Sequence, residues 1–285
     1  MLSSINHVKR TTTQRPAVPA FRVFTRFHGD ASLSMASMGD APKEGAKNFL
    51  VKYQEFAKNN PGTTHLDFWT FSNTIKKSYS GEVDSLDEED IKQCVIDMTP
   101  YRSTRLYDTA IMAITEMKIL IDKKMASLSR QTKELVSISD FSVVFALLTD
   151  GEDNQSFATK EDLKRTIRNF RKEYGATCLF MAANMDAEGI GVDYGFESSA
   201  CLQMGSDPHH ANNAFKSMTT ACLRSSSQTP IETHFTQIER QISCDVTEAQ
   251  QHSAPANTGL STYQRHCIAV HRNNTNQPFM IKIHR

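Results

Sequence analysis

Three separate loops of this sequence carry side chains whose oxygen atoms are suited to binding a metal ion. Asp30, Ser32 and Ser34 lie in GDASLSM, Thr104 lies in YRSTRLYDTA, and Asp150 lies in LLTDGEDN. Magnesium prefers hard oxygen ligands, about six of them at roughly 2.0–2.1 Å, and it gives up its waters reluctantly. If the fold brings the three loops together, we expect them to form a site for a divalent cation, Mg²⁺ or Mn²⁺.

Each of these residues also has an ordinary structural interpretation. Asp30 and Ser32 are suited to capping the turn that follows them, and Thr104 to capping the helix that is predicted just after it. Asp150, with the glycine after it, forms a common turn sequence. Only the ordered set of all of them favours a metal site.

Several neighbouring polar residues match no ligand position. Asp108 is interpreted as an acid in the first turn of a helix, and Asp153 as a solvated loop residue. His209 and His210 point about 100° apart if they are helical, so we interpret them as surface histidines rather than a metal pair.

The segments between these loops have the pattern of strands alternating with helices. Predicted strands cover residues 21–30, 65–72, 75–79, 141–151, 176–184 and 200–204. Predicted helices cover residues 41–59, 85–94, 106–125, 159–175 and 207–223. This alternation predicts an α/β fold, a doubly wound and mostly parallel sheet with helices on both faces, and such sheets bind ligands at the carboxyl ends of their strands.

The ordered loops resemble the von Willebrand factor A-type (vWA) domain and its metal-ion-dependent adhesion site (MIDAS), of the intracellular, viral or bacterial kind. That family has DxSxS after the first strand, a threonine ahead of a helix and an aspartate at the end of the fourth strand. LYDTA, TDGEDNQS and AANMDA, followed by Gly195, also fit its intracellular and microbial members. The resemblance covers residues 21–223 and implies a vWA/Rossmann-like domain there.

The resemblance also implies a role for each ligand and a function for the site. It implies that Ser32 and Ser34 bind the ion directly and that Thr104 binds it directly or through water. It also implies that Asp30 and Asp150 do not mainly bind the ion but supply negative charge just outside its ligands. A metal with a mostly neutral inner shell remains electrophilic and accepts a further oxygen. We therefore expect a protein-binding module, not an enzyme, that captures an Asp or Glu of a partner protein.

The sequence departs from the family pattern at several positions. Leu33 stands where DxSGS has a glycine, and Arg102 and Ser103 stand where a glycine commonly precedes the metal threonine. Arg22, Arg26 and His28 place polar groups on one face of the first strand, which predicts that this face borders the leader or the C-terminal segment, or that the strand is less central than the fold suggests. Positive charge on Arg26 and His28 would weaken cation binding.

Two other functions fit parts of the same sequence. The alternative function is a magnesium-dependent, phosphatase-like hydrolase with Asp30 as nucleophile and Asp150 holding the metal. Such enzymes usually carry a second aspartate two residues on, where this chain has Ser32. A dinucleotide-binding sheet would need GxGxxG after the first strand, and the loop offers only Gly29 and Gly39.

Composition narrows the classes of function further. The chain has 285 residues and a formal net charge of zero, so no overall field attracts nucleic acid or a membrane surface. No apolar run approaches the roughly 18 residues that span a bilayer. We expect a disordered basic leader at 1–20, the vWA-like domain at 21–223, and a C-terminal segment at 224–285 with a short hairpin at 267–283.

The six cysteines are scattered, without a CxxC pair or a zinc-finger spacing. We expect them to be free buried thiols, which are typical of a reducing compartment, and we expect a cytoplasmic location.

Overall fold

The computed structural model describes residues 22–60, 62–132, 136–151, 153–205, 207–227 and 234–244, and these contain one six-stranded sheet. The strands are β1 (Arg22–Asp30), β2 (Thr63–Phe71), β3 (Ile75–Glu82), β4 (Phe141–Thr149), β5 (Thr177–Ala183) and β6 (Cys201–Met204). The α-helices are α1 (Ala41–Asn59), α2 (Glu88–Asp97), α3 (Leu106–Thr132), α4 (Lys160–Tyr174), α5 (Ala187–Tyr194), α6 (Pro208–Ser225) and α7 (Gln237–Ser243).

The strand order is β3-β2-β1-β4-β5-β6. Only β3 runs antiparallel to its neighbour, as the second strand of a hairpin with β2. The chain leaves the central strand β1 in one direction across the sheet and returns to its other side at β4, which is the doubly wound arrangement predicted from the sequence. The β1–β4 register pairs Gly29 with Leu148, so both strands end at the same edge of the sheet.

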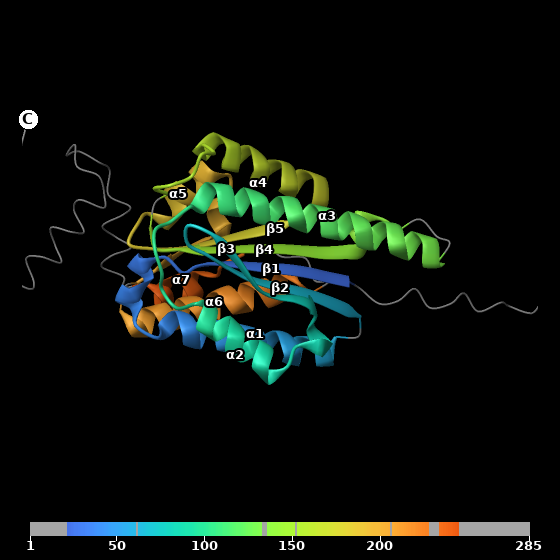
Figure 1. The fold of residues 1–285 in the computed structure, drawn as a ribbon, viewed down its shortest axis with the longest axis horizontal. Helices are drawn as coiled ribbons and strands as arrows, with labels where there is room; N and C mark the ends of the chain where they lie inside the picture. The colour runs from blue at the N-terminus through green and yellow to red at the C-terminus, as the bar shows by residue number, and fades with distance from the viewer. Residues whose placement is uncertain are drawn as a thin grey trace, which may run out of the picture.

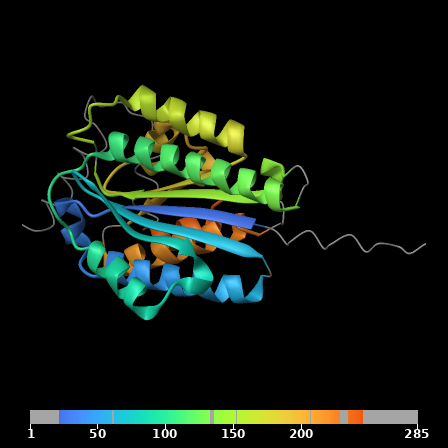
Figure 2. The ribbon, with the colours of Figure 1, turned by 45° about the vertical axis from the view of Figure 1, so that its right-hand side comes forward.

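Helices cover both faces of the sheet (Figures 1 and 2). α3, α4 and α5 pack on one face, and α1, α2, α6 and α7 lie on the other (Figure 1). Each face has its own apolar core, with Phe49 and Phe215 in one and Ile114 and Phe170 in the other. A sheet covered on both faces needs continuous apolar strands, and in β4 every residue except Ser142 is buried.

Helices α2 and α3 differ from their predicted bounds. α2 begins at Glu88 rather than at 85, because residues 83–85 form a short 3₁₀ turn and Asp87 caps the helix. The Asp87 side chain accepts a hydrogen bond from the amide of Asp90, whose carboxylate accepts one from the amide of Asp87. This reciprocal capping box satisfies two backbone amides, whereas a cap side chain alone satisfies one. α3 is also longer than expected and ends at Thr132 rather than near 125.

The strand with polar residues, β1, lies at the centre of the sheet, so the alternative that this strand is less central was wrong. Arg26 is buried, and its Nε donates to Asp67 on β2 at 2.9 Å. Its guanidinium lies 3.7 Å from the centroid of the Trp69 ring. A buried charge is tolerated where it is paired in this way, so the partners on β2 explain how an arginine enters a central strand.

Residues 234–244, inside the segment predicted as C-terminal, pack on the domain. Arg240 of α7 donates to the carbonyl of Cys201 at 2.6 Å, and the carbonyl of Ser243 accepts from the amide of Gly205 at 2.8 Å. The predicted leader and the hairpin at 267–283 lie outside the described residues, and the domain boundaries stay predictions. None of the helices in the described part of the chain has the length and apolar character to cross a membrane.

Candidate metal centre

The loop after β1 is organised by the carboxylate of Asp30. Asp30 Oδ1 accepts a hydrogen bond of 2.7 Å from the amide of Ser32, and Oδ2 accepts one of 2.7 Å from the hydroxyl of Thr149 at the end of β4. The side chain is completely buried. Both oxygens of Asp30 are therefore engaged in holding the loop against β4.

A chain of hydroxyl groups leads from this loop to Asp150. Ser34 Oγ donates to Asp150 Oδ1 at 2.7 Å, and Ser32 Oγ lies 2.9 Å from Ser34 Oγ. Because Ser34 uses its single proton on Asp150, Ser32 is the donor to Ser34. The other carboxylate oxygen, Asp150 Oδ2, is buried and has no hydrogen-bond partner.

The carboxylates of Asp30 and Asp150 lie close enough for their negative charges to repel each other. Burial, together with the charge of the nearby Asp30 carboxylate, raises the pKa of Asp150 to about 7, although the hydrogen bond from Ser34 favours its charged form. Burial also raises the pKa of Asp30, against hydrogen bonds from Thr149 and Ser32 that favour its charged form. Two buried acids at one edge of a sheet favour a positive charge between them or beside them.

Thr104 is brought to the same edge by its backbone. Its amide donates to the side-chain oxygen of Asn154 at 3.2 Å, and its carbonyl accepts from the amide of Asn154 at 3.2 Å. The carbonyl of Arg102 accepts from the amide of Leu33 at 2.8 Å, which joins the Thr104 loop to the loop after β1. The side chain of Thr104 is buried.

The two acids that match no ligand position have a structural role that the sequence did not reveal. Asp153, expected to be solvated, is half-buried and accepts from the amide of Tyr107 at 3.3 Å, so it helps to cap α3. Asp108 accepts from the amides of Phe157 and Ala158 at 3.0 and 2.8 Å. Together they fasten the loop after Asp150 to the start of α3, and only the placement of Asp108 in a first helical turn was visible in the sequence.

Neither base of β1 presents an unpaired charge to the site. Arg26 is paired with Asp67 and also donates to the carbonyl of Ala113. Burial lowers the pKa of His28 to about 3, with the charge of Arg26 adding to the effect, so His28 is neutral near pH 7. It lies stacked between Phe71 and Phe145. The expected repulsion of a cation by these residues therefore has little basis in the structure.

The donor set fits a hard divalent cation. Within the described residues no group of three or more His, Cys, Asp or Glu side chains gathers to hold a metal, so a site here depends on hydroxyl oxygens. Ser32 and Ser34 supply hard ligands of this type, and the buried, unpartnered oxygen of Asp150 supplies negative charge beside them. His209 and His210, by contrast, lie at the start of α6, where their amides donate to Asp207.

Comparison with known proteins finds similar solved structures, at low sequence identity. No family model and no curated protein matches the chain. Solved structures that are similar include proximal thread matrix protein 1 from the mussel byssus with a zinc-occupied MIDAS motif, at 14% identity and a TM-score of 0.47. Its match covers 72% of this chain and 47% of that one, so the chain spans about half of the mussel protein.

Two single domains are similar as well. The vWF domain of the pilus tip protein Mfa5 from Porphyromonas gingivalis has 10% identity and a TM-score of 0.48, over 74% of this chain and 98% of that one. The VWA domain of SpRpn10 has 13% identity and a TM-score of 0.41, over 74% and 100%. The chain has a fold similar to that of vWA domains. Solved vWA domains are thus among the structures to which this chain is similar, and the metal and the partners of those proteins are not carried over to this chain.

Proposed function

We propose that this protein is a divalent-metal-dependent protein-binding module. Mg²⁺ or Mn²⁺ would be held by Ser32, Ser34 and Thr104, with Asp30 and Asp150 as the balancing negative charges. The observation that carries the proposal is the hydrogen-bonded chain from Ser32 through Ser34 to Asp150, whose second oxygen is buried and unpartnered. A buried carboxylate oxygen without a partner is costly, and a cation at the site would satisfy it.

The hydrogen-bond directions support direct binding by the serines. Ser34 gives its proton to Asp150 and accepts one from Ser32, so one lone pair of its hydroxyl remains available to a cation. Asp30, with both oxygens occupied, holds the loop and contributes charge rather than a ligand atom. Ser34 is exposed, which leaves the site open to a partner. A bound cation would supply an electrophilic position for the carboxylate of a partner's Asp or Glu.

The hydrolase alternative has less support from the geometry. A nucleophilic Asp30 would need a free oxygen facing the substrate, but both of its oxygens accept hydrogen bonds and its side chain has no exposed surface. Turnover of a phosphate ester that is lost in Asp30→Asn would revive this alternative.

We also propose a reducing, cytoplasmic location for the protein. Cys94, Cys178, Cys201 and Cys222 are buried and form no disulfide, which fits such a compartment.

Retention of proteins from a cell lysate on the immobilised full chain tests the function. We expect a defined set of proteins to bind in Mg²⁺ and to be released by EDTA. The Ser34→Ala variant should no longer retain these proteins. The matched control Ser37→Ala, at an exposed serine one turn away, should retain them as the wild type does. Identical retention with Mg²⁺ and with EDTA would contradict the proposal.

A further inference from the structure

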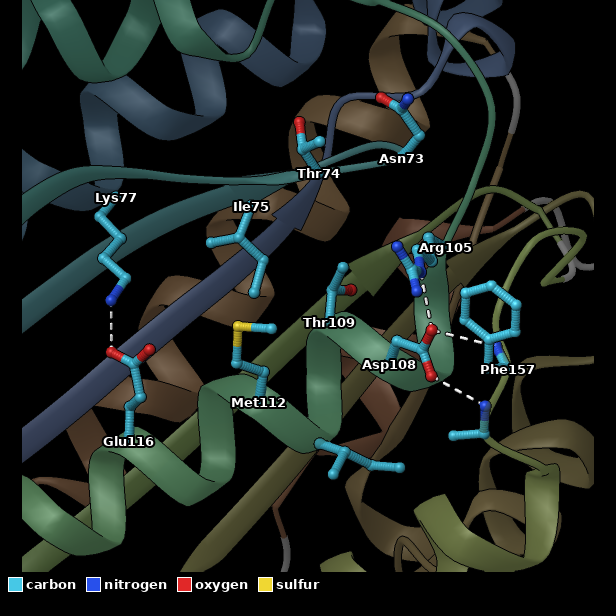
Figure 3. Close-up of a pocket in the computed structure, with 12 residues that line it drawn as sticks. Asn73, Thr74, Ile75, Lys77, Arg105, Asp108, Thr109, Met112, Glu116 and Phe157 are labelled. Carbon is cyan, nitrogen blue, oxygen red and sulfur yellow. Dashed lines mark hydrogen bonds and ion pairs between the residues drawn. The ribbon is translucent and has the colours of Figure 1, made fainter.

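An apolar groove opens beside the candidate metal centre, between α3, the start of β3 and the loop between β4 and α4 (Figure 3). It has a volume of about 670 Å³, and Ile75, Thr109 and Met112 point into it. We call it the α3–β3 groove. Its size is in the range of pockets that bind ligands.

The charged side chains of the α3–β3 groove are paired with each other. At one end Arg105 Nε donates to Asp108 at 2.7 Å, and at the other end Lys77 pairs with Glu116 (Figure 3). These pairs leave no single charge facing the interior of the groove. A charged occupant would lose its hydration without gaining a partner, so the groove favours an apolar occupant.

Two large apolar side chains at the groove are exposed to solvent. Phe157 is 88% exposed and Met112 is 49% exposed. The guanidinium of Arg105 lies 4.9 Å from the centroid of the Phe157 ring, which holds the ring at the mouth of the groove. Exposed aromatic and methionine side chains beside a concave apolar surface are typical of protein-binding sites.

The groove adjoins the loop that carries Thr104. Arg105, which lines it, directly follows Thr104, and the amide of Arg105 donates to the carbonyl of Ser72 in the β2–β3 turn. On the other side of Thr104, Arg102 is exposed and has no ion-pair partner among the described residues. A free positive charge at this position complements an acidic segment that approaches the metal centre.

We infer that the α3–β3 groove binds a bulky apolar side chain of the same partner segment whose acidic residue reaches the metal centre. The partner is then a protein with an exposed, extended segment in which an Asp or Glu lies a few residues from a Leu, Ile, Met or Phe. This inference rests on the proposed function and names the class of its partner. The metal would select the acid and the groove would select its apolar neighbour.

A displayed library of random short peptides, selected on the full chain in Mg²⁺, tests this inference. We expect the enriched peptides to share an acidic residue at a fixed spacing from a bulky apolar residue. Phe157→Ala and Met112→Gln should each weaken binding of an enriched peptide by about tenfold. Changing the apolar residue of the peptide to Ala should weaken binding to the wild type but add little to the effect of Met112→Gln.

The matched control is Ile119→Gln, on the same helix and 48% exposed, but away from the groove. It should leave binding unchanged, and thermal melts of all variants should show intact folds. Equal binding by Met112→Gln and Ile119→Gln, or enrichment of acids without an apolar neighbour, would overturn the inference. If enrichment of the apolar residue persists in EDTA without any acid, the metal-dependent function fails while apolar docking in the groove stands.

Discussion

The hydroxyl of Ser34 donates a hydrogen bond of 2.7 Å to Asp150, which lies 116 positions later in the chain. This bond joins the loop after β1 to the end of β4, and Thr149 joins the same two elements through Asp30. The candidate site is therefore a property of two adjacent strand ends, and neither loop forms it alone.

Thr149→Val should weaken metal binding although Thr149 is not a proposed ligand. The valine has nearly the same shape but cannot donate to Asp30 Oδ2, so the loop after β1 loses its tie to β4. Loss of such a supporting hydrogen bond typically costs about 10–100-fold in metal affinity. Calorimetric titration with Mn²⁺ measures the effect, and Thr149→Ser, which keeps the hydroxyl, is the control. Equal affinity of the Val and Ser variants would contradict the role of Thr149.

Asp67→Ala should destabilise the fold strongly. Asp67 accepts hydrogen bonds from Arg26, His65 and Ser80, and its loss leaves the buried charge of Arg26 without its partner. Removing one member of a buried ion pair costs about 3–5 kcal/mol of unfolding free energy. Urea unfolding measures this cost.

The double variant Arg26→Met, Asp67→Leu provides the comparison for this prediction. It removes both charges, so it should lose less stability than Asp67→Ala. A loss of unfolding free energy below about 1 kcal/mol in Asp67→Ala would contradict the buried ion pair between Arg26 and Asp67.

Stability should fall in acid partly through Glu82. The neighbouring His65, with its Nδ1 3.9 Å from Glu82 Oε1, and then the hydrogen bond from Lys124 lower the pKa of Glu82 from 4.5 to about 2 despite partial burial. A carboxylate with a lowered folded-state pKa stabilises the fold above its unfolded value and loses that contribution as the pH falls. The free energy of unfolding should therefore drop between about pH 4.5 and pH 2. The drop should be shallower in Glu82→Gln, and an identical slope in both proteins would contradict this origin.

Local signals in the sequence were enough to predict several elements. The helix predicted at 41–59 matches α1, because its apolar residues repeat at helical spacing and Asn60 and Gly62 follow it. Thr159 caps α4 and Gly175 ends it with a φ of 58°, a conformation that glycine adopts without strain. Where neighbouring residues alone determine an element, its bounds were predictable.

Features that depend on distant partners were not predictable. The burial of Arg26 in a central strand requires Asp67 and Trp69 on β2, and no local sequence pattern predicts these contacts. The capping of α3 by Asp153 and the bond from Thr149 to Asp30 likewise join residues on separate elements. The order of the site residues was visible in the sequence, but the hydrogen bonds that hold them together were not.

Isothermal titration calorimetry with Mn²⁺, on the wild type and on Asp150→Ala, tests the central claim most directly. The variant loses both the acceptor for Ser34 and the buried unpartnered oxygen. We predict saturable heat for the wild type with one ion per chain, and none for Asp150→Ala although it stays folded. Equal heats from the two proteins would contradict a metal site at these strand ends.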